Sequence, residues 1–182
     1  MELREEVVYC LERIPGEASN QALIAAYKDA RDDFKPRILA ALGHRRAQSA
    51  VSLCVEAMRS PNQNTAVMAV RAFGRIGRKP ATPPRYPDPK TLSGTQAVDD
   101  IDGMLRYADA QVAEGYSAEA IAIYKGALDR PQEHWQCAAV VGLSKIGTAD
   151  AAAAILPKLK SGDRKVRIAA ENAWRAMAGA KA

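Results

Sequence analysis

A pattern that recurs every 31 positions constrains the fold of this chain more than any other feature. Four segments resemble one another: AALGHR, RAFGRIG, VGLSKIG and NAWRAMAG. Their apolar anchor residues are Leu42, Phe73, Leu143 and Trp174, which are separated by steps of 31, 70 and 31 positions. Repeats of about 20–50 residues are typical of solenoids, in which each unit buries its apolar face against its neighbours.

The same step extends the repeat to six units. Counting back 31 positions from Leu42 reaches Leu11, and the same count back from Leu143 reaches Val112. The step from Phe73 to Val112 is longer, because it contains an insertion of eight in addition to the regular step. We therefore predict one domain of about six helical pairs that covers the whole chain, 1–182.

Further apolar residues recur at fixed distances from the anchors. Eight residues before the anchors, five of the six units carry a large apolar side chain, and Thr65 is the exception. Twelve and sixteen residues after the anchors, four units carry apolar residues about one helical turn apart, which marks the buried face of a second helix. These three columns are Leu3, Phe34, Met104, Trp135 and Val166; Leu23, Cys54, Tyr124 and Ile155; and Tyr27, Met58, Leu128 and Leu159.

The pattern predicts an all-α fold, an α–α superhelix (solenoid) of antiparallel helical pairs. We expect first helices near 2–14, 33–44, 62–76, 100–114, 132–146 and 163–178, and second helices near 17–29, 47–59, 117–128 and 148–160. The third and sixth units lack the second-helix pattern. The connections carry Gly, Ser, Asn and Asp, which end helices and cap the following ones.

Residues 78–94 form a proline-rich insertion that holds five of the ten prolines. Proline cannot continue a helix, so we expect the third unit to lose all or part of its second helix. The composition is consistent with a mobile excursion and also with a contact loop for a partner. In the second case Tyr86 and the basic residues around it would touch the partner.

The net charge of +5 is unevenly distributed along the chain. Residues 1–34 carry a net charge of −4, residues 35–90 carry +9, and residues 91–182 are neutral. A basic segment of this kind indicates an anionic partner or improves solubility. Our candidate partner-binding residues are Arg45, Arg46, Arg59, Arg71, Arg75, Arg78, Lys79, Arg85, Tyr86 and Lys90.

Two segments resemble known helical repeats. The segment GLSKIGTADAAAAILPKLKSGDRKVRIAAENAWRAMAG resembles a HEAT-like repeat of the phycobilisome-lyase type, with Val166-Arg167 as its apolar-Arg pair. The segment AEGYSAEAIAIYKGALDRP resembles a tetratricopeptide repeat. The residues on that family's spacing are Gly115, Ala120, Tyr124, Ala127 and Leu128. Both resemblances imply an armadillo-like solenoid of helical pairs whose usual role is to bind other proteins.

The sequence contains no recognisable catalytic or metal-binding motif. Its two histidines, His44 and His134, are far apart in the chain. Glu133-His134 resembles the His-Glu pairs of HEAT-repeat metal hydroxylases, but it is a single pair in reversed order. Because a Ser-His-Asp order, a phosphate loop and an HExxH motif are also missing, we expect no catalytic residues, no metal and no cofactor.

The cysteines and tryptophans are expected to be structural. Cys10, Cys54 and Cys137 are odd in number and far apart, which favours a reducing compartment, so we expect a cytoplasmic protein with buried thiols. Trp135 and Trp174 fall on apolar repeat positions and are expected in the core. No apolar run reaches about 18 residues, so we expect no membrane span.

We therefore interpret the chain as a non-catalytic scaffold for protein–protein interaction, with its partner surface on the second helices. The first alternative is nucleic-acid binding through residues 35–90, which resembles the DNA glycosylases that use HEAT-like repeats. The second alternative is a bilin-lyase-like subunit, which follows from the repeat subtype alone. Because neither end has a capping helix, we expect a piece of a longer protein, or an end-to-end or homo-oligomeric contact.

Overall fold

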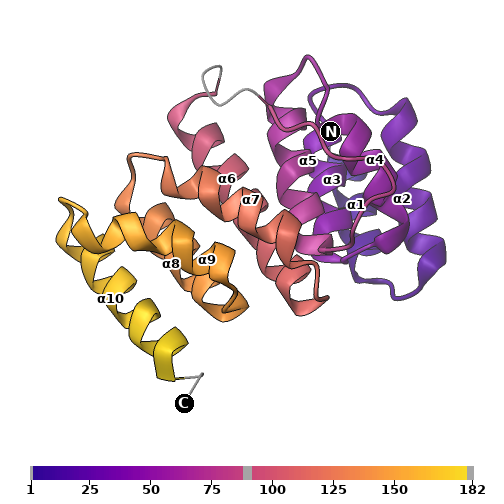
Figure 1. Cartoon of the computed structure of the whole chain (residues 1–182). Helices are drawn as coiled ribbons and strands as arrows, with labels where there is room; N and C mark the ends of the chain where they lie inside the picture. The colour runs from indigo at the N-terminus through magenta and orange to yellow at the C-terminus, as the bar shows by residue number, and fades with distance from the viewer. Residues whose placement is uncertain (1, 88–91, 180–182) are drawn as a thin grey trace. The chain divides into compact units, whose positions relative to one another are not determined.

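The computed structural model describes residues 2–87 and 92–179 of the chain. All regular structure among these residues is helical, with ten α-helices, two short 3₁₀ helices and no strand (Figure 1). Neighbouring helices pack in pairs, so the all-α solenoid class predicted from the repeated pattern is confirmed. None of the described helices is both long and apolar enough to cross a lipid bilayer.

The helices follow the expected order of first and second helices. The first helices are α1 (Glu2–Arg13), α3 (Lys35–His44), α5 (Gln63–Ile76), α6 (Gly94–Ala113), α8 (Glu133–Ile146) and α10 (Arg164–Gly179). The second helices are α2 (Glu17–Asp29), η1 (Gln48–Ala50) with α4 (Val51–Ala57), α7 (Ser117–Leu128), and α9 (Ala149–Ile155) with η3 (Leu156–Lys160). The third unit has no second helix in its described residues, as the prolines predict.

Helix ends coincide with the capping residues that the sequence places there. The side chains of Asn62 and Thr148 each accept a hydrogen bond from the backbone N–H three residues later, at the starts of α5 and α9. Gly77 and Gly147 end α5 and α8 with φ of 72° and 69°. Glycine adopts this left-handed conformation without the steric penalty of a Cβ atom.

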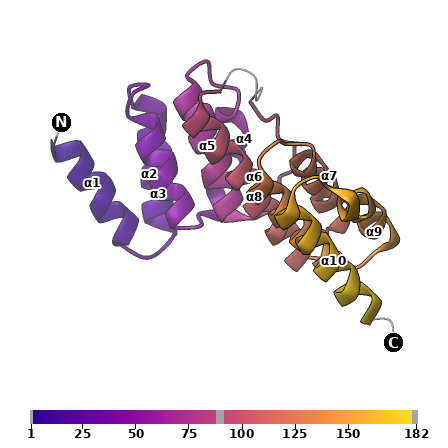
Figure 2. The same ribbon diagram turned by 90° about the vertical axis from the view of Figure 1, so that its left-hand side faces the viewer.

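The chain forms two compact units, Met1–Tyr107 and Ala108–Ala182. In the first unit α1, α3 and α5 follow one another side by side, with α2 and α4 as their second helices (Figure 2). The second unit pairs α7 with α8 and α8 with α10. The apolar columns form the cores, and their fully buried members include Leu23, Leu42, Cys54, Phe73, Tyr124, Leu143 and Ile155.

Some expectations about the core are wrong. Trp174 is 40% exposed, because no described helix covers the flank of α10 on which it lies. Cys10 is exposed and Cys137 is half-buried, whereas burial raises the pKa of the Cys54 thiol to about 12. Thr65, the polar exception in its column, is nevertheless buried. The side chain of Leu3, expected in the same column, lies outside the described residues.

The first helices of the first unit approach one another through glycines. A Cβ atom on Gly43 would lie 2.7 Å from the Cα of Ala72, and one on Gly74 would lie 2.1 Å from the carbonyl oxygen of Gly103. Both contacts join residues separated by the same number of positions in the sequence. Helix α6 therefore packs on α5 with the same sequence offset between contacting residues as α5 packs on α3.

The eight residues that interrupt the repeat lengthen α6. This helix has 20 residues, and its start at Gly94 lies one regular step after the start of α5 at Gln63. The Nε2 of Gln96 donates to the Oδ1 of Asn64 at 2.7 Å, and the two residues have the same sequence separation as the pairs that join α3 to α1. Eight residues are about two helical turns, so α6 keeps the step from α5 and is extended by two turns.

Helix α6 consequently carries two repeat registers. In the first unit Met104 is the repeat equivalent of Phe73, since they are one regular step apart and their helices pack in the regular way. In the second unit Val112 is the equivalent of Leu143, which lies one regular step later. The boundary between the two compact units falls between these two positions.

Candidate partner-binding grooves

Two grooves occupy equivalent positions of the repeat, one in each unit. One lies between α3 and α5, and the other lies between α8 and α10. Five lining residues of the first groove have an equivalent in the second groove, at one constant offset along the sequence. These pairs are Ala40 and Val141, Met68 and Ala169, Arg71 and Asn172, Ala72 and Ala173, and Arg75 and Ala176.

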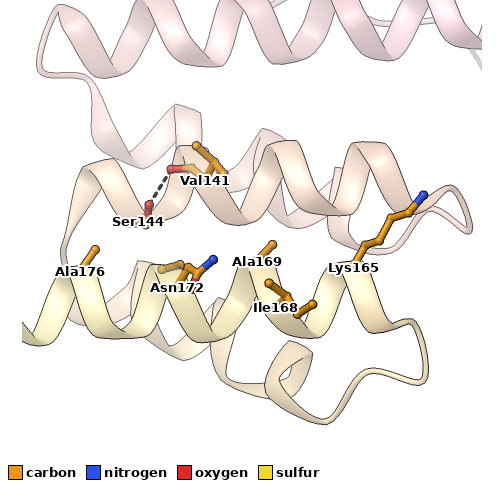
Figure 3. A pocket seen from close by; sticks show the side chains of 8 residues that line it. Val141, Ser144, Lys165, Ile168, Ala169, Asn172 and Ala176 are labelled. Carbon is orange, nitrogen blue, oxygen red and sulfur yellow. Dashed lines mark hydrogen bonds between the residues drawn. The ribbon is translucent and has the colours of Figure 1, made fainter.

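The α8–α10 groove is open and mainly apolar, with a volume of about 510 Å³. Val141 and Ile168, at its walls, are 47% and 45% exposed, and Figure 3 shows them on facing helices. Half of the other lining residues are alanines, namely Ala169, Ala173 and Ala176. Ser144 donates its hydroxyl to the carbonyl oxygen of Val141 at 2.8 Å, so this polar group is satisfied within α8.

One end of the α8–α10 groove carries a charged pair. The Lys165 ammonium group is paired with the carboxylate of Glu133, and this hydrogen bond raises the pKa of Lys165. The remaining polar lining residue, Asn172, lies between Ile168 and Ala176 on α10 (Figure 3). The groove can therefore accept apolar side chains along most of its length and a polar group at its edge.

The α3–α5 groove is smaller, about 230 Å³, and cationic. It is lined by the apolar residues Ala40, Met68 and Ala72 and by His44, Arg71 and Arg75. Burial, followed by the nearby charges of Arg71 and Arg106, lowers the pKa of Arg75, while the charge of Glu12 opposes this effect. The groove is therefore suited to an anionic group.

The cations of this groove differ in their counter-charges. The Arg71 guanidinium lies 3.2 Å from the Oδ1 of Asp99, and the Nδ1 of His44 lies 2.6 Å from the Oε1 of Glu12. Partial burial raises the pKa of Glu12, but hydrogen bonds from His44 and Arg37 lower it overall. Within the described part of the chain, Arg75 has no carboxylate partner.

Among the ten predicted binding residues, Arg71 and Arg75 line one groove and the others are dispersed. Arg46, Arg59 and Arg85 are exposed at separate places, and Lys79 is exposed beyond the end of α5. Arg78 donates to the Oε1 of Gln48 at 2.8 Å. Lys90 lies outside the described residues.

Two of the predicted residues have roles within the fold. The Arg45 guanidinium donates to backbone carbonyls at the end of α1, at 2.6–3.0 Å, and to Asn20. The Tyr86 hydroxyl is buried, and burial, with Tyr107 and Asp100 nearby, raises the pKa of Tyr86. The proline-rich segment thus turns Tyr86 toward α6 instead of toward solvent.

Sequence reasoning missed the residues that give the α8–α10 groove its character. Val141 and Ile168 are apolar side chains that fall outside the buried columns, two and six residues before their anchors. The sequence did offer one signal for this groove: an apolar residue at a position that the helical periodicity assigns to the exposed face of an amphipathic helix. The sequence also placed the partner surface on the second helices, whereas both grooves lie between first helices.

The described residues include no group of three or more His, Cys, Asp or Glu side chains that could hold a metal ion. Among solved structures, the chain is similar to human deoxyhypusine hydroxylase in complex with glycerol, with a TM-score of 0.38 and 15% identity. The alignment covers 97% of this chain and 80% of that chain. No protein-family model and no curated protein matches the chain. The helical pairs are compatible with a HEAT-like repeat, and a TM-score of this size defines neither a family nor an activity.

Proposed function

We propose that the chain is a non-catalytic protein-binding scaffold whose α8–α10 groove holds apolar side chains of a protein partner. The exposure of Val141 and Ile168 on facing helices supports this proposal. Contiguous apolar surface rimmed by polar residues marks interaction sites in soluble proteins. Here the polar residues that line the groove are Lys165, Ser144 and Asn172.

The size and lining of the groove favour a short apolar segment of a partner. Its volume of about 510 Å³ lies within the range of about 300–1,000 Å³ that is usual for ligand pockets. The alanines on α10 allow the backbone of a partner to approach closely. The side chains of Val141 and Ile168, which are exposed to water in the free chain, then supply the apolar contacts with the partner.

A binding measurement with matched variants tests this function. Peptides are selected from a random displayed library against the immobilised full chain, and their Kd values are measured by fluorescence anisotropy. Ile168→Asp should raise Kd by about tenfold or more, because a carboxylate would lie in the apolar contact. Leu156→Asp is the control, since Leu156 is 51% exposed on η3 and does not line the groove.

The control should keep its Kd within about twofold of the wild-type value, which corresponds to less than about 0.5 kcal/mol. Circular dichroism of both variants checks that the helices are intact. An equal loss of affinity in the two variants, or a selection that yields no peptide, would count against the groove as a docking site.

A further inference from the structure

A column of basic side chains crosses the four first helices of the first unit. Each lies two residues after a repeat anchor, and successive members are one regular step apart. We call Arg13, His44, Arg75 and Arg106 the basic row. Helix α1 packs on α3, α3 on α5 and α5 on α6. The four residues therefore lie on successive neighbouring helices, which Figure 2 shows as ribbons.

Packing of the helices does not require this basic row. In the second unit Ala176 occupies the position of Arg75 and Lys145 occupies that of His44, so α10 packs on α8 without a charge of its own at this position. Cations favour the C-terminal turn of a helix, which accounts for Arg13, His44 and Arg75. It does not account for Arg106, which lies seven residues before the end of α6.

The close helix packing removes the counter-charge from part of the row. In α1 the residue before the row is Glu12, which accepts hydrogen bonds from both Arg37, at 3.0 Å, and His44. In α3 and α5 that position is glycine, because no larger residue fits there. Neither Arg75 nor Arg106 forms an ion pair with a carboxylate among the described residues. Their charges act on each other, and the charge of Glu12 also acts on Arg75.

The spacing of the row matches an extended peptide better than nucleic acid. Packed helices are about 8–10 Å apart, and a polyproline II segment places every third side chain on one side, about 9 Å apart. Proteins that bind DNA through its phosphates can make about 6–10 such contacts. The row offers fewer cations, and the carboxylates of Glu5, Asp99 and Asp102 lie on the same helices.

We propose that the basic row binds an extended acidic segment of a protein partner that carries a carboxylate at every third residue. The inference rests on the proposed role in protein binding, but it concerns residues of the first unit alone. Arg75 and Arg106 supply the central contacts, and Arg13 extends the row at α1, where its guanidinium lies 4.2 Å from the centre of the Tyr9 ring.

A designed peptide tests the spacing. The probe is a labelled peptide of repeated Glu-Pro-Pro units, and its partner probe has the same composition with all glutamates grouped at one end. Binding to the full chain is measured by fluorescence anisotropy at low and moderate salt. The repeated peptide should bind more tightly than the grouped peptide, and added salt should weaken its binding because the contacts are exposed.

Charge-reversal variants test the residues. Arg75→Glu and Arg106→Glu should each raise the Kd of the repeated peptide by about fivefold or more, since attraction is replaced by repulsion at a central contact. Arg59→Glu makes the same change in net charge at an exposed residue outside the row and should leave Kd within about twofold. Arg75→Ala removes the charge without reversing it. Alanine fits at this repeat position, as Ala176 shows in the second unit, so a higher Kd of this variant reports the loss of the charge alone.

Three results would overturn the inference. They are an equal loss with Arg59→Glu, equal binding of the grouped peptide, and tighter binding of a mixed-sequence DNA duplex with the same sensitivity to Arg75→Glu. Ile168→Asp separates this site from the α8–α10 groove, because it should leave the binding of the Glu-Pro-Pro peptide unchanged. Failure of either site is therefore recognisable without failure of the other.

Discussion

At the scale of single residues, Arg45 joins two repeats. Its Nη1 donates to the carbonyl oxygens of Leu11, Glu12 and Ile14, and its Nη2 donates to that of Gly16. The last carbonyl groups of a helix have no partner within the helix, so a guanidinium at this place completes the end of α1. A basic residue that the charge distribution assigned to a partner thus contacts its own chain.

Lys158 has a comparable role in the second unit. Its Nζ donates to the carbonyl oxygen of Leu128 at 2.7 Å, at the end of α7, and to the Oε1 of Gln136 at 3.0 Å. In both units a basic side chain therefore satisfies carbonyl groups at the end of an earlier helix.

The first prediction at this scale concerns Arg45→Lys. Lysine keeps the charge but lacks the planar fork that reaches several carbonyl groups at once, so the free energy of unfolding should fall by about 1–3 kcal/mol. Urea unfolding followed by circular dichroism measures this loss as a lower midpoint with an unchanged slope. Arg59→Lys, at an exposed site, is the control, and equal midpoints for the two variants would contradict the structural role of Arg45.

At the scale of elements, glycine determines how closely first helices pack. The carbonyl group of Gly103 lies against Gly74, where even one methyl group has no room. Backbone atoms cannot move aside as a flexible side chain can. The spacing between α5 and α6 therefore depends on hydrogen atoms at both positions.

Gly74→Ala should destabilise the first unit by more than about 2 kcal/mol through overpacking. Gly126→Ala, in the last turn of α7, should instead stabilise the second unit by up to about 0.5–1 kcal/mol, because no atom lies within 4 Å of the added Cβ. The unfolding midpoints of the two variants show directly whether each substitution stabilises or destabilises the chain. A stabilising effect at Gly74 would show that α5 and α6 are not packed through their backbones.

At the scale of the whole molecule, the chain contains two compact units. Both tryptophans, Trp135 and Trp174, lie in the second unit. Tryptophan fluorescence therefore reports on the second unit, whereas circular dichroism reports on the helices of both. In repeat proteins, stability is a sum of local terms between neighbours, so different units can unfold at different denaturant concentrations.

This difference gives a prediction for the whole chain. Gly74→Ala should lower the midpoint for part of the circular dichroism signal and leave the midpoint of the tryptophan signal unchanged. Coincident shifts of both signals would indicate that the chain unfolds in one cooperative step. Gly126→Ala is the reciprocal variant, since it should raise the unfolding midpoint that is measured by tryptophan fluorescence.

The helix boundaries could be predicted from the sequence because their causes are local. The prolines of residues 78–87, the caps at Asn62 and Thr148, and the columns through Leu42 and Leu143 all act within a few residues of their position. The longer α6 was partly missed, because the eight additional residues continue a helix and carry no signal of their own.

The sequence by itself therefore determined the repeated helical pairs, their order and most of the core. Tertiary structure decided the position of Trp174, the burial of Tyr86, the contacts of Arg45, and both grooves. These features depend on residues one repeat apart that become neighbours only when helices stack. The periodic pattern identifies which helices stack, but the distance between them is set by side-chain volume at the contacts, as the glycines of α3 and α5 show.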